Sequence, residues 1–200
     1  MTGFLGKAYS PRSADETRDL YDDWAASYEA EVAQNGYATP GRCAEALAAH
    51  VGDMSTPVLD FGCGTGLSGR ALKLAGFEAI DGADLSADML KQAAEKSTYQ
   101  TLTQVEATDP IPAGYSVMAA IGVIGAGAAP ISLFHALMTA LPSGGLLVFS
   151  FNDQALKDPA NEAAVAEWID PGAAHLLFKE YGDHLPGIGL KSNVYVIEKA

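Results

Sequence analysis

A short apolar strand that ends in a glycine-rich turn constrains the fold of this chain more than any other feature. Residues 58–66 read Val-Leu-Asp-Phe-Gly-Cys-Gly-Thr-Gly, and a helical pattern follows from Leu67 to about Ala75, where Gly76 closes it. Glycines allow turn angles that are closed to other residues, and they let a ligand approach the backbone closely. A strand, a glycine turn and a helix in this order are typical of the ligand-binding unit of a parallel α/β sheet.

Helical and strand patterns alternate along the chain, which predicts a parallel sheet with crossover helices. Two helices precede the first strand. One begins at Ser13, where Ser-Ala-Asp-Glu fits a capping box, and the other begins with Thr39 as N-cap and Pro40 at its first position. Further strands are expected at 78–84, 99–105, 115–121 and 146–151, with helices at 86–96, 130–141 and around 161–168.

The end of the chain predicts an antiparallel hairpin, because β-branched and aromatic residues at 174–181 and 193–199 flank glycine and proline turns. These elements together predict an α/β fold with an open, doubly wound, mostly parallel sheet of seven strands. We expect residues 1–52 to form a helical lid packed on a Rossmann-like domain at 53–200. The ligand of such a sheet binds off the carboxyl ends of its strands.

Composition excludes several classes of function. Lys and Arg number 12 and Asp and Glu number 25, which gives a net charge of −13 and no basic stripe for nucleic acid. No apolar run approaches the length of a membrane-spanning helix, and the first residues do not read as a secretory signal. Cys43 and Cys63 form neither a metal cluster nor a disulfide framework, and no histidine pair has the spacing of metal ligands. We therefore expect a cytoplasmic protein without a metal.

Two familiar phosphate-binding motifs fit the glycine turn poorly. A P-loop can be aligned through Gly64 and Gly69, but Arg70 and Ala71 replace its lysine and its metal-binding hydroxyl. A dinucleotide motif fits formally through the glycines at 64, 66 and 69. That alignment places the first glycine three residues beyond the strand and leaves Asp60 without a role.

A third reading joins Asp60 to Gly62, Gly64 and Gly66. A carboxylate at a strand end beside bare backbone suits a ligand with an ammonium group rather than a pyrophosphate. With this motif the sequence closely resembles the class I S-adenosylmethionine-dependent methyltransferases, and the resemblance covers most of the chain. It implies S-adenosylmethionine as the cofactor, S-adenosylhomocysteine as the product, and Cys63 as a further contact in the turn.

A second carboxylate supports this resemblance. Asp84 ends the second strand, 18 residues after Gly66, and begins the segment Asp-Leu-Ser-Ala-Asp-Met-Leu, which matches the Asp-x-Ser-x-x-Met-Leu pattern that the resemblance leads us to expect. A carboxylate there can accept both ribose hydroxyls of a nucleoside. The resemblance implies that Leu85 lies against the adenine. Asp81 is the competing acid, but it points to the same side of its strand as Ala83, not as Asp84.

The loop after the third strand offers two carboxylates for the adenine. The resemblance implies that Glu106 accepts the adenine amino group and that the backbone of Ala107 donates to the ring. Asp109 is the runner-up, although it also suits the start of the turn that Pro110 continues. The resemblance also places Ile121, at the end of the fourth strand, against the cofactor.

The first helix resembles the opening helix of many small-molecule methyltransferases, in which it covers the cofactor. Its segment 21–29, together with stretches around the second and fifth strands, is similar to a subgroup of methyltransferase-like proteins named for the Williams–Beuren syndrome region. The resemblance implies that Tyr21 and Tyr28 approach the methionine end of the cofactor. The alternative is that Leu20, Trp24 and Tyr28 only pack the helix onto the domain.

The resemblance implies in-line transfer of a methyl group to a small-molecule acceptor. The alternatives are methylation of a protein or peptide, cofactor binding without catalysis, and a nicotinamide-dependent oxidoreductase. The sequence assigns no general base. His184, in the terminal hairpin, is a weak candidate because the hairpin can bring it over the site.

Overall fold

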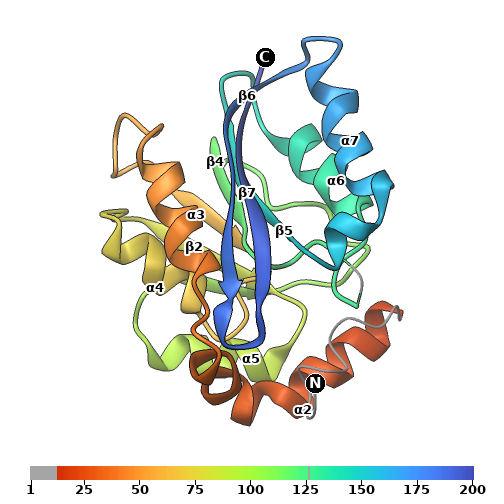
Figure 1. Cartoon of the computed structure of the whole chain (residues 1–200). Coiled ribbons are helices and arrows are strands. Elements are labelled where there is room, and N and C mark those ends of the chain that lie inside the picture. Colours follow the sequence, from red (N-terminus) through yellow and green to blue (C-terminus); the bar gives the residue numbers. More distant parts are fainter. Residues whose placement is uncertain (1–12, 126) are drawn as a thin grey trace.

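The computed structural model describes residues 13–125 and 127–200, and within them it contains one seven-stranded sheet (Figure 1). The strand order is β3-β2-β1-β4-β5-β7-β6. Only β7 runs antiparallel to its neighbours, β5 and β6. The strands are β1 (Val58–Phe61), β2 (Ile80–Asp84), β3 (Thr101–Gln104), β4 (Val117–Ala120), β5 (Leu146–Asn152), β6 (Ala174–Leu185) and β7 (Leu190–Lys199). The predicted sheet with its terminal hairpin is confirmed.

Helices cover both faces of this sheet. They are α2 (Ala14–Gln34), α3 (Thr39–Ala48), α4 (Leu67–Leu74), α5 (Ala87–Glu95), α6 (Ser132–Ala140) and α7 (Pro159–Ile169), with short 3-10 turns η1 (Ala155–Lys157) and η2 (Pro186–Ile188). Figure 1 shows α3 and α4 on one side of the strands and α6 and α7 on the other. Among the described helices, none combines the length and the apolar character needed to cross a lipid bilayer.

The core is divided by the sheet into two apolar clusters, as the alternation of side chains along a strand requires. On the β4 strand, Val117 and Ala119 belong to the cluster under α3 and α4, whereas Met118 and Ala120 belong to the cluster under α6 and α7. All four residues of β4 are buried. This explains why the central strands read as continuous apolar runs.

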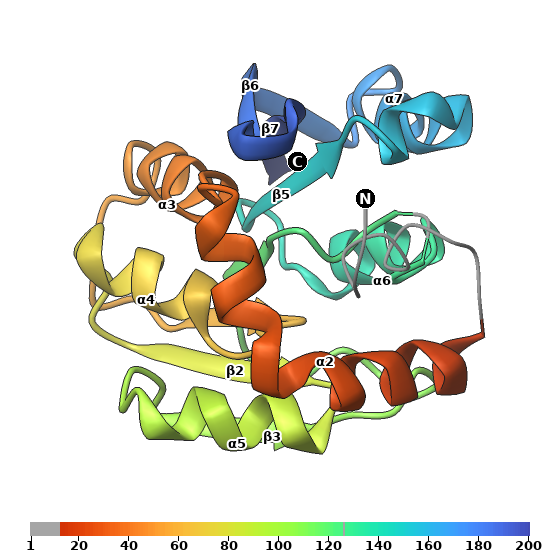
Figure 2. The ribbon, with the colours of Figure 1, turned by 60° about the horizontal axis from the view of Figure 1, so that its bottom comes forward.

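The first helix, α2, begins where its capping box predicts. Ser13 and Glu16 form the reciprocal capping box, and Asn35 is the C-cap. Figure 2 shows α2 lying across the near end of the sheet, beside α5. Its buried Trp24 packs in a separate cluster with Val32 and with two residues of the terminal hairpin.

The second helix differs from its prediction at the first turn. Ala38 occupies the N-cap position of α3, and Thr39 is the first helical residue. The Thr39 hydroxyl instead lies 2.8 Å from His184 Nδ1 and 3.0 Å from Ser192 Oγ, both in the hairpin. Cys43 and its helical neighbours belong to the same core cluster as β1 and α4. The predicted domain boundary at residue 52 stays a prediction. The packing of α3 nevertheless makes this helix one layer of the core.

Candidate functional site

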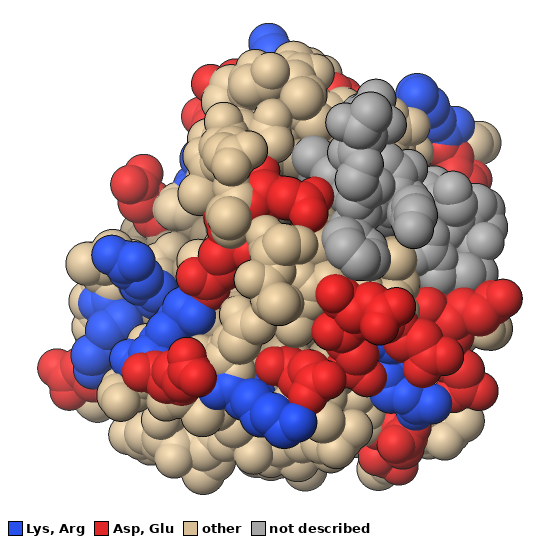
Figure 3. All heavy atoms as spheres, turned by 90° about the horizontal axis from the view of Figure 1, so that it is seen from below, with Lys and Arg blue, Asp and Glu red and all other residues tan. Residues whose placement is uncertain are grey.

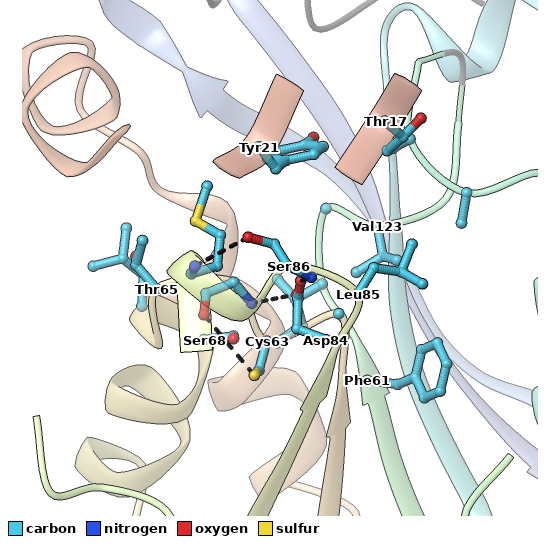
Figure 4. A pocket seen from close by; sticks show the side chains of 18 of the residues that line it. Thr17, Tyr21, Phe61, Cys63, Thr65, Ser68, Asp84, Leu85, Ser86 and Val123 are labelled. Atoms are coloured by element: carbon cyan, nitrogen blue, oxygen red, sulfur yellow. Dashed lines mark hydrogen bonds between the residues drawn. The ribbon is translucent and has the colours of Figure 1, made fainter. Parts of the chain in front are cut away.

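A cavity opens at the carboxyl ends of β1, β2 and β4 and is roofed by α2. Figure 4 shows Thr17 and Tyr21 of α2 across the cavity from Asp84, Leu85 and Phe61. The space between its walls is about 870 Å³, which includes the solvent-filled volume at its open mouth. Most of the predicted site residues line it, namely Tyr21, Tyr28, Gly62, Cys63, Gly64, Asp84, Leu85 and Ile121.

The glycine turn forms the floor of this cavity. Gly62, Gly64 and Gly66 all have positive φ angles, of 73°, 53° and 93°, which other residues adopt at a cost. A Cβ atom on Gly62 would lie 2.5 Å from a methyl carbon of Val123, whereas one on Gly64 would meet no described atom within 4 Å. The backbone at Gly64 is therefore open to a ligand. Gly66 is the N-cap of α4 and is buried against Tyr99 rather than lining the cavity.

Asp84 is the carboxylate that faces this cavity. One of its oxygens accepts a hydrogen bond of 2.8 Å from the Gly64 N–H, and the other accepts one of 2.9 Å from the Ser86 N–H. Burial raises the pKa of Asp84, although these N–H groups act in the opposite direction. An ionised carboxylate has about four lone-pair positions. Each Asp84 oxygen thus keeps acceptor capacity for the two hydroxyls of a ribose.

Asp60 does not share this cavity, which corrects the expectation that both carboxylates face one ligand. Its side chain is fully buried and accepts hydrogen bonds from Ser68 Oγ at 2.6 Å and from the Tyr99 hydroxyl at 2.7 Å. Burial raises the pKa of Asp60 to about 6. The side chain points under the first turn of α4, where Ser68 lies, and Ser68 itself lines the cavity. Asp60 therefore shapes the site through Ser68.

Glu106 and Ala107 line a second chamber that adjoins the first. The two share Thr17, Phe61, Leu85, Ala128, Ala129 and Leu133 in their walls. Glu106 is exposed and pairs with Arg18 of α2 at 3.1 Å. Asp109 accepts a hydrogen bond of 2.8 Å from the Glu106 N–H and so closes the turn. The assignment of Glu106 and Ala107 to the adenine stays a prediction.

The aromatic residues of α2 fall into two groups, which correspond to the two roles considered from the sequence: covering the cofactor and packing the helix onto the domain. Tyr21 and Tyr28 line the cavity, whereas Trp24 is buried between them. The Trp24 ring centroid lies 5.8 Å from that of Tyr21 and 4.8 Å from that of Tyr28. The packing interpretation holds for Trp24. The predicted approach of Tyr21 and Tyr28 to the cofactor stays a prediction.

Sequence reasoning missed Tyr37, which lines the cavity from the segment between α2 and α3. Its hydroxyl lies over Gly122, where a Cβ atom would come within 2.4 Å of the Tyr37 oxygen. It also missed Thr65, which lines the cavity and whose buried hydroxyl has no hydrogen-bond partner among the described residues. Thr65 stands inside the glycine motif, but the position of Tyr37 depends on tertiary packing and leaves no local signal.

His184 is not placed to act as a base. It is buried, it packs edge-on against Tyr37 with ring centroids 5.3 Å apart, and it is not among the described residues that line the cavity. Burial lowers the pKa of His184 to about 4, so the ring is neutral at pH 7. Its Nδ1 is engaged with Thr39. The ring supports the hairpin and the back of Tyr37.

The residues present fit S-adenosylmethionine. The open backbone at Gly64 and the free acceptor capacity of Asp84 suit its amino acid and ribose parts. Thr65 lines the same cavity, and its buried hydroxyl has no hydrogen-bond partner among the described residues, which leaves one polar group there unsatisfied. These features are independent of any known relative.

Comparisons with known proteins agree with this fit. Residues 34–186, more than half of the chain, match the family model of a methyltransferase domain. Human methyltransferase-like protein 27 is 32% identical over 131 residues, which are 62% of this chain and 54% of that protein, so the chain spans about half of the length of this relative.

Solved structures share the fold at low identity. Magnesium protoporphyrin IX methyltransferase from Synechocystis, solved with bound S-adenosylmethionine, has a TM-score of 0.60 at 14% identity over 98% of this chain and 90% of that chain. The [4+2]-cyclase SpnF has a TM-score of 0.69 at 13% identity over 96% and 98% of the two chains. With the match to the family model, the fold and the fit of the cavity, the chain belongs to the class I S-adenosylmethionine-dependent methyltransferases.

Proposed function

We propose that this protein transfers a methyl group from S-adenosylmethionine to a small-molecule acceptor. The observation that carries the proposal is the roof over the site. Thr17, Tyr21 and Tyr28 of α2 cover the glycine turn, so an acceptor enters a chamber rather than docking on an open face. A folded protein substrate would have to insert a narrow extended segment beneath this helix.

The chain contributes binding, orientation and the exclusion of water. The cofactor, when bound, supplies a methyl group already activated on a sulfonium. The proposed task of Asp84 and the Gly64 backbone is to hold the nucleoside and the amino acid in one orientation. Well-oriented reacting groups gain up to roughly 7–11 kcal/mol relative to free encounter. The rings of Tyr21 and Tyr28 keep water from the reacting atoms.

The part of the adjoining chamber that is lined by the segments after β4 and β5 suggests the character of the acceptor, because the residues predicted for the adenine, Glu106 and Ala107, come from the loop after β3. Its walls include small and apolar side chains, such as Ala129, Ile131 and Leu133, together with the polar Gln154 and Asn161. We therefore expect an acceptor with an apolar body and at least one polar group. Figure 3 shows Asp and Glu side chains gathered on the face that α2 crosses, and this charge favours neutral or cationic acceptors over anionic ones.

The names of the structural relatives do not choose the acceptor class. They include the protoporphyrin enzyme, a cyclase and a ribosomal protein L11 methylase, the last with a TM-score of 0.56 at 17% identity over 79% of this chain and 77% of that one. One fold hosts many reactions. The acceptor class is therefore argued from the chamber itself.

A methyl-transfer screen tests the proposal. The protein is incubated with S-adenosylmethionine and with fractions of small metabolites or of peptides, and S-adenosylhomocysteine is measured. We expect product with a small-metabolite fraction. Product with peptide fractions alone would move the assignment to protein methylation, and binding without product in any fraction would leave a binding protein. Thermal stabilisation by NADH but not by S-adenosylhomocysteine would overturn the cofactor.

A further inference from the structure

The α2 helix is fastened to the rim of the site by polar side chains along one of its faces. Arg18 pairs with Glu106 at 3.1 Å, Asp22 accepts a hydrogen bond from the Ser86 hydroxyl, and Glu29 pairs with Lys96. Positions 18, 22 and 29 are spaced by four and by seven residues, so they fall on one side of the helix. That side lies over α5 and the loops after β2 and β3.

The middle contact is the one that reaches the cofactor cavity. Ser86 is the N-cap of α5, and its hydroxyl accepts a hydrogen bond of 3.0 Å from the Met89 N–H while it donates to Asp22. Its backbone N–H donates to Asp84 at 2.9 Å. The other Asp84 oxygen is bonded to Gly64. A continuous series of hydrogen bonds thus runs from α2 to the glycine turn, and Figure 4 shows its inner part.

The geometry of Ser86 makes these contacts depend on one another. A serine hydroxyl has one proton, and here that proton goes to Asp22, which leaves its lone pairs free to cap α5. Asp22 also lies 3.4 Å from the Asp88 N–H, at the amino end of the same helix, where a negative charge is favourable. Its neighbour Tyr21 lines the cavity. Asp22 thus belongs to the roof helix, and its carboxylate binds Ser86 in the loop that follows Asp84. It connects the roof of the site to that loop.

We propose that Asp22 is a positioning residue for cofactor binding: through Ser86 it fixes Asp84 toward the cavity and seats the α2 roof at the same time. Asp22 itself does not touch the cofactor. The inference rests on the proposed function only in taking Asp84 as a ligand of the nucleoside. Roof and carboxylate then form one cooperative unit, and loosening either one weakens binding at the other.

The test compares the same chemical change at two adjacent positions. Asp22→Asn removes the charge that receives the Ser86 proton, whereas Asp23→Asn changes an exposed carboxylate on the same helix. Affinity for S-adenosylhomocysteine is measured by isothermal titration at a temperature well below unfolding. We expect Asp22→Asn to weaken binding about tenfold, and Asp23→Asn to bind within about twofold of the wild type.

Variants at Ser86 separate positioning from a general loss of stability. Ser86→Ala removes the link and Ser86→Thr keeps the hydroxyl, so we expect the threonine variant to restore most of the affinity. In the Ser86→Ala background, Asp22→Asn should have little further effect, because both changes break one connection. Wild-type affinity in Asp22→Asn, or additive losses in the double variant, would overturn the proposal. Since binding is the readout, failure to find an acceptor would count against the proposed function and not against this inference.

Discussion

At the scale of residues, the polarity and the shape of the cavity depend on the side chain of Asp84 and on the absence of a side chain at Gly122. Asp84 supplies the carboxylate that faces the cavity from the end of β2. Gly122 matters for the opposite reason, because the Tyr37 hydroxyl occupies the space where its side chain would begin.

Asp84→Asn is expected to weaken the binding of S-adenosylhomocysteine by about 1.5–3 kcal/mol, the contribution of hydrogen bonds to a charged group. Isothermal titration measures the change. Asp81→Asn is the matched control, because Asp81 lies on the same strand but bonds Thr101 and Tyr115 instead of lining the cavity. Equal affinities of the Asp84 variant and the wild type would remove Asp84 from the site.

Gly122→Ala is expected to destabilise the fold and to displace Tyr37. The φ angle of Gly122 is 72°, which by itself costs alanine about 1–2 kcal/mol, and the new methyl would meet the Tyr37 oxygen. Gly114→Ala isolates the backbone cost, since its φ is also positive and its Cβ meets no described atom within 4 Å. Tyr37→Phe in the Gly122→Ala background should recover stability in denaturant unfolding. Equal losses for the two glycine variants would contradict the clash.

At the scale of elements, Tyr99 ties together three segments that are distant in the sequence. It lies between α5 and β3, its hydroxyl accepts a hydrogen bond of 3.0 Å from the Gly69 N–H in α4, and it donates to Asp60 of β1. A Cβ atom on Gly69 would lie 2.3 Å from this hydroxyl. The tyrosine therefore sets how close α4 approaches the sheet and holds the carboxylate beneath the glycine turn.

Tyr99→Phe should lower the free energy of unfolding by about 1–3 kcal/mol, because it leaves the buried Asp60 carboxylate and the Gly69 N–H without this partner. Tyr181→Phe provides the control. The Tyr181 hydroxyl also donates to a carboxylate, Asp153, but the side chain is 54% exposed, so water replaces the lost bond. Unfolding in urea measures both variants. A loss at Tyr99 no larger than that at Tyr181 would contradict the role assigned to this residue.

At the scale of the whole molecule, two buried groups give folding opposite dependences on pH. The pKa of Asp60 is raised to about 6, so its contribution to stability is present below pH 4 and is lost as the pH rises through 6. The pKa of His184 is lowered to about 4, so its contribution is present above pH 6.5 and is lost as the pH falls through 4. Over roughly the same pH interval, the two groups therefore change the free energy of unfolding in opposite directions.

A variant that removes Asp60 or His184 should reveal the pH dependence that the other group gives to stability. We expect the stability of Asp60→Asn to rise by about 2–3 kcal/mol more than that of the wild type between pH 4 and pH 6.5. The stability of His184→Asn should instead fall relative to the wild type over the same range. The free energy of unfolding, measured at several pH values, tests both. Parallel curves for the three proteins would show that neither group is shifted.

Local signals in the sequence determined most of the fold. Three local features illustrate this: the capping box at Ser13, the N-cap at Ser86 and the glycines of the turn. Each acts on its nearest neighbours in the sequence, so its effect can be predicted without the rest of the chain. The predicted hairpin strands were too short, because pairing between β6 and β7 continues through polar residues to Leu185 and Leu190. The third predicted strand was too long, since Tyr99 at its start is turned to α4 and Asp60.

The sequence by itself determined the order of the strands and helices, the glycine turn, and the placing of Asp84 at a strand end that faces the cavity. Only the tertiary structure decided that Asp60 lies beneath α4, that Glu106 pairs with Arg18, that Tyr37 lines the cavity, and that Asp22 is bonded to Ser86. The physical reason is the distance along the sequence over which each kind of interaction acts. Backbone propensity and side-chain alternation depend on residues a few positions away, whereas the partner of a buried carboxylate or hydroxyl is chosen by elements that meet only after the chain has folded.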